Sequence, residues 1–166
     1  MDAEQLSEMR DNWEVAIEGD GGHCPCCNRW GKIYKRPLNA SMARSLLWLV
    51  NGSNRGDGWA HVPSTAPTWM LRSLQLPTLH LWGLVESSDT KTKLASSGLW
   101  KPTQKGIAFA DDLCTVPKYV YVYDNTVRGF EGPDIDIEDA LGSKYNYAEI
   151  MANYDGTPST FEESAK

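Results

Sequence analysis

Apolar side chains recur at helical spacing in two segments near the start of the chain, residues 4–18 and 40–51. A run of glycines follows the first segment, and Asn39 or Ser41 can cap the start of the second. Both segments are therefore predicted to form amphipathic helices. The positions that define their apolar faces are Leu6, Met9, Trp13, Ile17, Met42, Leu46, Leu49 and Val50.

Short helical and strand-like patterns alternate over residues 59–113. Pro63 is expected to end a strand, Gly83 is expected to end a helix, and Thr103 can cap the helix that follows it. The predicted order is strand, helix, helix, strand, strand and helix. These elements occupy residues 59–63, 67–75, 77–83, 84–88, 98–103 and 104–113, with a polar loop between the last two strands.

A β-hairpin is predicted over residues 116–132, because Val and Tyr alternate there and Asp124-Asn125 supplies a two-residue turn. It is followed by two short predicted helices in residues 134–154, of which the first ends at Gly142. Asp134 or Asp136 can cap that first helix. The acidic group at its start suggests a metal site, but such groups more often form a solvated face with helix caps. Its members are Asp134, Asp136, Glu138 and Asp139.

The net charge of −6 is distributed unevenly over the 166 residues. Residues 1–28 hold one basic and seven acidic side chains, residues 29–105 hold eleven and three, and residues 106–166 hold four and twelve. The middle is therefore basic between acidic ends. Because the field at a surface depends on nearby charge, such a segment can attract phosphate even in an acidic protein. The alternative is that the segments fold together and neutralise one another.

Several classes of protein are disfavoured by the sequence. The N-terminus lacks the apolar core of a signal peptide, and no apolar run approaches the roughly 18 residues that a membrane span requires. We therefore expect a cytoplasmic protein with no membrane partner. There is no phosphate-binding glycine loop, nucleophile elbow or zinc-protease motif, so an enzyme is not expected. A His23 and Cys26 nucleophile pair is a minor alternative.

Three of the four cysteines occur in the C-P-C-C stretch at residues 24–27, which matches the C-P-x-C half of a zinc knuckle. Cys24 and Cys27 are the favoured pair, because His23 and Cys26 are too close in sequence to join the same ion easily. The alternative is a tight turn of free or buried cysteines without metal. The only other Cys or His residues are His61, His80 and Cys114, and the predicted zinc ligands are Cys24, Cys27, His61 and Cys114.

A family resemblance is carried by residues 83–86 (GLVE) and 100–106 (WKPTQKG). They resemble the strand that follows the recognition helix, and the return from the wing, in winged-helix proteins of the MarR and PadR type. The resemblance implies a winged helix-turn-helix over residues 38–113, with residues 77–83 as the recognition helix. Pro77 departs from the family pattern, so that helix is expected to be short or tilted.

The whole chain also resembles small phage and prophage proteins that share the C-P-x-C turn, the winged helix and an ending with VPKY and ALG, here residues 116–119 and 140–142. This likeness implies a phage origin in a bacterial host cell and no particular biochemistry. The expected fold class is α+β, with a winged helix-turn-helix core, an N-terminal Cys-rich knuckle and a small C-terminal β-hairpin plus helices. The segments are an acidic helix (1–22), the knuckle and a strand (23–37), the winged helix (38–113), the hairpin with helices (114–154) and a flexible acidic tail (155–166).

The leading functional hypothesis is binding of double-stranded DNA by a phage regulator, with the recognition helix in the major groove and the wing on the backbone. A weakness is that TLHLWG presents few side chains able to read bases. The predicted DNA contacts are Arg29, Lys32, Lys35, Arg36, Arg44, Arg72, Ser73, Gln75, Thr78, His80, Lys91 and Lys93.

The second hypothesis is a protein-interaction module that inhibits a host enzyme or defence complex. The acidic ends and five tyrosines with the potential to be exposed support it. A monomer is slightly favoured over a homodimer, because the chain has no long terminal helices of the kind that MarR-type dimers use. The tyrosines are Tyr119, Tyr121, Tyr123, Tyr145 and Tyr147.

Overall fold

The computed structural model describes residues 2–88 and 98–153, and it divides the chain into two compact units. The smaller unit contains the described residues up to Pro37 together with Tyr119–Glu131. The larger unit contains the described residues from Leu38 to Lys118 and those after Glu131. Helices and small antiparallel sheets occur together, which confirms the expected α+β class.

The smaller unit starts with helix α1 (Ala3–Glu18), which begins at Asp2 with a reciprocal capping box to Gln5. A two-stranded hairpin of β1 (Gly22–His23) and β2 (Trp30–Gly31) follows. The helix packs on this hairpin, and a Cβ atom added at Gly31 would lie 2.6 Å from the ring of Trp13. A glycine is therefore needed where the helix meets the second strand.

A three-stranded antiparallel sheet has the order β3 (Tyr34–Pro37), β7 (Val116–Tyr123) and β8 (Thr126–Ile135). The turn between β7 and β8 places Asp124 at φ 49° and Asn125 at φ 60°, as the tightest hairpin turns require. This confirms the predicted hairpin and its turn.

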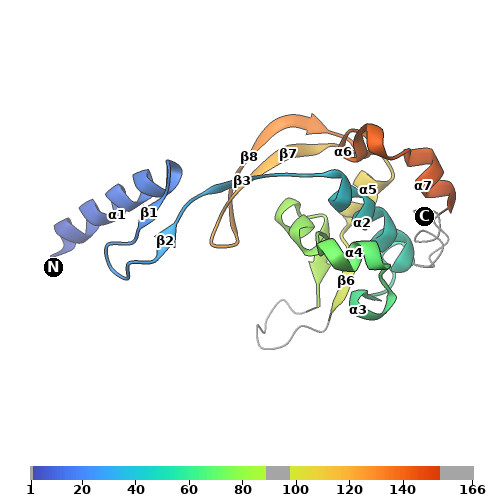
Figure 1. Cartoon of the computed structure of the whole chain (residues 1–166), viewed down its shortest axis with the longest axis horizontal. Coiled ribbons are helices and arrows are strands. Elements are labelled where there is room, and N and C mark those ends of the chain that lie inside the picture. The colour runs from blue at the N-terminus through green and yellow to red at the C-terminus, as the bar shows by residue number, and fades with distance from the viewer. Residues whose placement is uncertain (1, 89–97, 154–166) are drawn as a thin grey trace. The chain divides into compact units, whose positions relative to one another are not determined.

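Helix α2 (Ala40–Gly52) is the centre of the larger unit (Figure 1). The elements that contact it are α4 (Thr68–Ser73), η1 (Leu76–Trp82), β6 (Leu99–Pro102), α5 (Gln104–Ala110) and α6 (Ile137–Leu141). Every residue from Met42 to Val50 is buried, because neighbours cover the polar side of the helix as well as its apolar face. Of the two possible caps, Asn39 is the one used: its side chain accepts a hydrogen bond from the Met42 N–H at 2.9 Å.

A second three-stranded sheet in the described residues is antiparallel, with the order β4-β6-β5. Pro63 does not simply end a strand as predicted. It lies in the first turn of a short helix, where the missing N–H costs nothing. The helix predicted at residues 77–83 is a 3₁₀ helix. It ends at Gly83, which is in the left-handed conformation as expected. The elements are β4 (Ala60–His61), α3 (Val62–Thr65), α4 (Thr68–Ser73), η1 (Leu76–Trp82), β5 (Val85–Ser87), β6 (Leu99–Pro102) and α5 (Gln104–Ala110).

Two short helices and a 3₁₀ turn complete the larger unit: α6 (Ile137–Leu141), η2 (Gly142–Lys144) and α7 (Tyr147–Asn153). The cap of α6 is Asp136, one of the two alternatives from the sequence. Among the described residues, no helix is both long and apolar enough to cross a lipid bilayer.

The junction between η1, β5 and α5 depends on the TQKG stretch. The Thr103 hydroxyl donates to the Gly83 carbonyl at 2.6 Å, and the Lys105 ammonium donates to the Trp82 carbonyl at 3.1 Å. Thr103 also caps α5 as predicted, accepting from the Gly106 N–H at 3.0 Å. A Cβ atom at Gly106 would lie 2.0 Å from the Leu84 carbonyl oxygen, so helix and strand touch through the glycine.

We therefore expect Gly106→Ala to lower the free energy of unfolding by about 1–3 kcal/mol, because the new methyl group must push backbone away from backbone. Urea denaturation followed by tryptophan fluorescence measures this. Gly129→Ala is the matched control, because no atom lies within 4 Å of a Cβ at that position. Equal unfolding midpoints for Gly106→Ala and the natural protein would contradict the tight contact.

Candidate functional site

Three basic side chains of the smaller unit occur within eight residues of the sequence, and we call them the basic strip: Arg29, Lys32 and Arg36. Arg29 and Arg36 are exposed and Lys32 is half-buried. In the part of the chain that the structure describes, none of the three forms an ion pair. Their charges are therefore available to an anionic partner, and their contact with nucleic acid stays a prediction.

Two exposed aromatic rings alternate with the basic strip. Trp30 is 54% exposed and Tyr34 is 50% exposed, which is unusual for large rings in a folded protein. The Lys32 ammonium lies 5.9 Å from the centroid of the Tyr34 ring, so charge and ring are adjacent. Tyr34 and Arg36 share one face of β3, because alternate residues of a strand point to the same side.

Lys35, which was also predicted to contact DNA, interacts with other groups of the protein instead. It forms an ion pair with Glu131, and its ammonium lies 4.3 Å from the centroid of the Tyr119 ring. The hydrogen bond to Glu131 raises the pKa of Lys35, and hydrogen bonds from Lys35 and then Tyr121 lower the pKa of Glu131. Lys35 is thus a poorer phosphate contact than its neighbours.

Arg44 was predicted to contact DNA, and this prediction is wrong. The side chain is only 8% exposed, and its guanidinium lies 3.8 Å from the ring centroid of Trp69 and 5.0 Å from that of Tyr145. An Nη1 N–H also donates to the Tyr145 hydroxyl at 3.4 Å. The planar cation stacks inside the larger unit, where no phosphate can reach it.

The predicted recognition helix presents few side chains to solvent. Four residues of η1 are buried, and the Nδ1–H of the exposed His80 donates to the Pro77 carbonyl at 2.7 Å. Gln75 and Thr78 are half-buried, whereas Arg72 and Ser73 are exposed at the end of α4. Lys91 and Lys93 lie outside the described residues.

Other basic side chains of the larger unit stabilise its structure. Arg55 pairs with Asp111, and the Lys101 ammonium lies 3.2 Å from a carboxylate oxygen of Glu86. Lys101 also lies 4.6 Å from the centroid of the Trp59 ring. The positive middle of the sequence is therefore partly neutralised on folding, as the alternative interpretation of the charge pattern held.

The cysteines at residues 24–27 form the tip of the β1–β2 hairpin. The Cys24 N–H donates to the Arg29 carbonyl and the Asn28 N–H to the Cys24 carbonyl, each at 2.8 Å. Asn28 adopts a left-handed conformation at φ 61°, which closes the turn. The Cys26 N–H points at the Cys24 sulfur at 3.4 Å, so the backbone supports a negative sulfur there. All four cysteines of the chain are free thiols.

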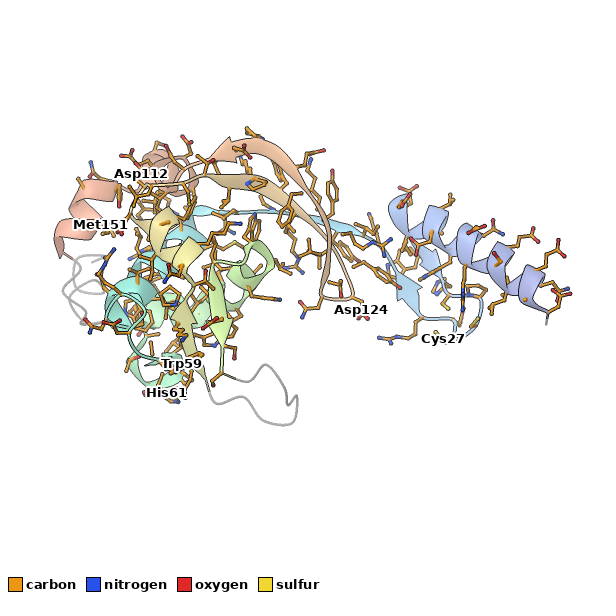
Figure 2. The ribbon with its side chains drawn as sticks, turned by 180° about the vertical axis from the view of Figure 1, so that it is seen from behind. Cys27, Trp59, His61, Asp112, Asp124 and Met151 are labelled. Carbon is orange, nitrogen blue, oxygen red and sulfur yellow. The ribbon has the colours of Figure 1, made fainter. Side chains whose placement is uncertain are left out.

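The predicted set of four zinc ligands is not assembled. Figure 2 places His61 and Asp112 on opposite sides of the larger unit, and Cys114 follows two residues after Asp112. His61 Nδ1 lies 2.6 Å from the Ser64 hydroxyl, and the Cys114 thiol lies 3.9 Å from the Lys105 carbonyl oxygen. His61 and Cys114 therefore cannot share one ion, so the predicted set of four is wrong. Zinc binding by Cys24 and Cys27 stays a prediction.

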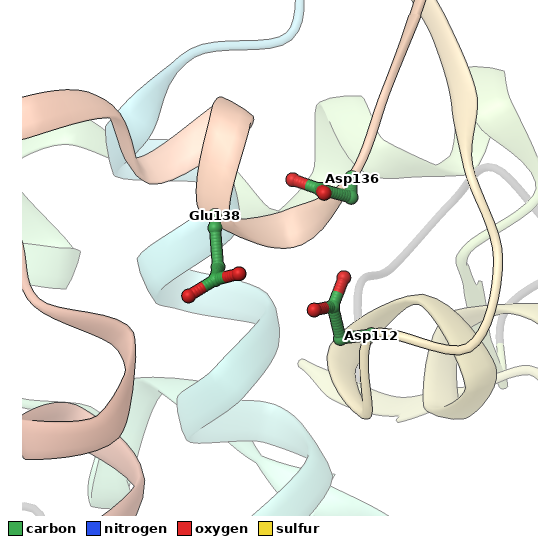
Figure 3. A group of neighbouring side chains, drawn as sticks. All are labelled: Asp112, Asp136 and Glu138. Carbon is green, nitrogen blue, oxygen red and sulfur yellow. The ribbon is translucent and has the colours of Figure 1, made fainter.

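One group of carboxylates does come together in the described residues: oxygens of Asp112, Asp136 and Glu138 lie within 4.8 Å of one another (Figure 3). Carboxylate oxygens suit Mg²⁺ or Ca²⁺. Asp136 is already used, because it accepts the Asp139 N–H at 2.7 Å as the cap of α6. Asp112, which stands at φ 61° after α5, was not anticipated from the sequence.

Two leucines at the end of α4 are exposed to solvent, and sequence reasoning missed them. Leu71 is 36% exposed and Leu74 is 61% exposed. Leu74 is also in the left-handed conformation, at φ 46°. The αL position that follows a helix normally holds Gly or Asn. Leucine is unfavourable there because its Cβ atom strains the left-handed backbone, and because its apolar side chain is exposed to water.

Comparison of the chain with family models, with curated proteins and with solved structures gave no match.

Hydrogen bonds to the Cys24 sulfur from the backbone N–H groups of Cys27 and Cys26 lower the pKa of this thiol. Because the thiolate is the reactive form, Cys24 should be alkylated at a lower pH than an ordinary cysteine. The test uses a variant with Cys26, Cys27 and Cys114 changed to serine, which keeps both N–H groups. The pH midpoint of its reaction with iodoacetamide should rise in 8 M urea, because unfolding removes the two hydrogen bonds to the sulfur. Identical midpoints in folded and unfolded protein would show that these N–H groups do not stabilise the thiolate.

Proposed function

We propose that this protein binds nucleic acid, chiefly through the phosphate backbone. The observation that carries the proposal is the basic strip of Arg29, Lys32 and Arg36, whose charges have no ion-pair partner among the described residues. Lys and Arg side chains that neutralise phosphates release counterions, and this release supplies most of the affinity for any sequence.

We further propose that the larger unit is a winged helix-turn-helix, and double-stranded DNA is the first candidate ligand. The order of elements supports this: α2, β4, α3, α4, η1, β5, β6 and α5, with β4, β6 and β5 in one antiparallel sheet. In such folds the helix before the second strand enters the major groove.

Base reading is expected to be weak. Contacts that specify sequence come from side chains that reach base edges in a groove. At the position of the recognition helix this protein has a 3₁₀ helix with four buried residues, and His80 is its exposed polar side chain. Arg72 and Ser73 add two more polar groups at the end of α4. We therefore expect similar affinity for unrelated duplexes.

The exposed rings of Trp30 and Tyr34 extend the proposal to unpaired bases. Aromatic side chains beside basic ones are the usual platform on which bases stack, at about 1–3 kcal/mol per base. A duplex keeps its bases stacked inside, so these rings favour duplex ends or single-stranded regions. A comparison of duplex with single-stranded oligonucleotides of the same length separates the two contributions.

The combined substitution of Arg29→Gln, Lys32→Gln and Arg36→Gln should weaken binding to a random duplex. The slope of log Kobs against log salt concentration should become shallower by about 2–3, since each lost phosphate contact removes roughly 0.9. Fluorescence anisotropy at four salt concentrations measures both effects.

Lys35→Gln is the matched control on the same strand. Because Lys35 is held by Glu131, removal of its charge should change the slope little. An unchanged slope in the triple variant, or an equal loss in Lys35→Gln, would contradict the proposed role of the basic strip.

The second candidate function is a protein-interaction module, and the exposed Leu71 and Leu74 favour it. An exposed apolar pair on a helix end suits a protein partner better than a phosphate. Affinity capture that retains one stoichiometric partner on the natural protein, but not on a Leu71→Ser and Leu74→Asn variant, would support this candidate. If the protein also bound no duplex in a salt-dependent way, nucleic-acid binding would be excluded.

Leu74→Gly should raise the free energy of unfolding by up to about 1 kcal/mol, because glycine adopts the left-handed conformation without the cost that a Cβ atom imposes. Chemical denaturation measures the change. Affinity for nucleic acid should stay the same, because Leu74 lies apart from the basic strip in the sequence and carries no charge. A loss of stability would show that the leucine side chain contributes more to folding than its exposure suggests.

A further inference from the structure

The cysteine turn supplies a pair of metal ligands. Cys24 is half-buried, with its sulfur supported by the Cys26 N–H at 3.4 Å, whereas Cys27 is exposed at the tip of the turn. The C-x-x-C spacing of Cys24 and Cys27 is the one that zinc sites use, with both sulfurs as thiolates.

Two sulfurs are half of a structural zinc site, which is almost always tetrahedral with four protein ligands. The smaller unit also holds Cys26, which lies between Cys24 and Cys27 in the same turn, and one His, His23, whose Nδ1 lies 3.1 Å from the Asn28 carbonyl oxygen. The Cys and His residues of the larger unit are His61, His80 and Cys114, none of which belongs to a Cys-x-x-Cys pair. One chain therefore offers a single Cys-x-x-Cys pair.

We propose that two copies of this chain share one zinc ion, held by Cys24 and Cys27 of each copy. The same two-residue half-site, used twice, gives the four-sulfur set that zinc favours. Pro25, Cys26, Cys27 and Asn28 are all exposed, so nothing within the smaller unit blocks the approach of a second turn.

The charge next to the turn fits this arrangement. Four thiolates around Zn²⁺ carry a net charge of about −2, which costs free energy unless cations lie nearby. Each copy contributes Arg29, which follows the turn directly and whose carbonyl accepts the Cys24 N–H. Two copies therefore contribute two arginines that follow directly after the ligand turns.

The shared ion would place two basic strips next to each other, because each strip starts directly after the turn at Arg29. Two linked binding surfaces raise the overall affinity for a long ligand without any new contact. The zinc site itself does not rest on the proposed nucleic-acid binding, and it departs from the monomer expected from the sequence.

The experiment measures metal content and molecular mass on the same sample of the full chain. We expect about half an equivalent of zinc per chain, a dimer by multi-angle light scattering with zinc, and a monomer after chelation. Cobalt substitution should give the visible bands of a tetrahedral site with intense sulfur-to-metal charge transfer. Cys24→Ser and Cys27→Ser should each abolish metal binding and dimerisation.

Cys26→Ser is the matched control in the same turn, and it should keep both properties, as should His61→Ala and Cys114→Ala. Circular dichroism of every variant confirms that it is folded. One zinc per monomeric chain, loss of zinc in His61→Ala or Cys114→Ala, or no zinc binding at equimolar metal would each overturn the proposal.

Discussion

The backbone pairing of β3 with β7 is the constraint on which the arrangement of the smaller unit depends. It joins residues 34–37 to residues 119–122, which are more than eighty positions away in the sequence. This register brings Lys35 beside Tyr121 and Glu131, and it leaves Arg36 on the other face of the strand. Strand alternation thus decides which cations stay free for a partner and which are neutralised within the fold.

Local signals in the sequence predicted the elements well, because caps and turns depend on a few adjacent residues. Asn39, Gly83 and Thr103 act as caps where expected, and Asp124-Asn125 forms the hairpin turn. What the sequence could not predict are contacts between distant segments. The burial of Arg44 against Tyr145, about a hundred residues away, has no local signature. Arg44 is the one charged side chain of α2, and the neighbouring sequence does not tell whether it faces solvent or Tyr145.

The same distinction applies to the candidate sites. The cysteine turn could be predicted from the sequence, because its geometry is set within six residues. The third and fourth zinc ligands, His61 and Cys114, depended on contacts between distant segments and were predicted wrongly. The exposed Leu71 and Leu74 look like ordinary core positions in the sequence, and only the left-handed end of α4 turns Leu74 outward. The hairpin residues Tyr119–Glu131 belong to the same unit as the N-terminal segment. That grouping also depends on contacts between distant parts of the chain, so the sequence did not predict it.

Charge on the basic strip, rather than base reading by a helix, is the proposed basis of function. The most direct test is the salt dependence of binding by the natural protein to two random duplexes of unrelated sequence. We predict equal affinities for the two and a slope of log Kobs against log salt of about −3 or steeper, from at least three phosphate contacts. No binding at low salt, a slope near zero, or a large preference for one duplex would contradict the account.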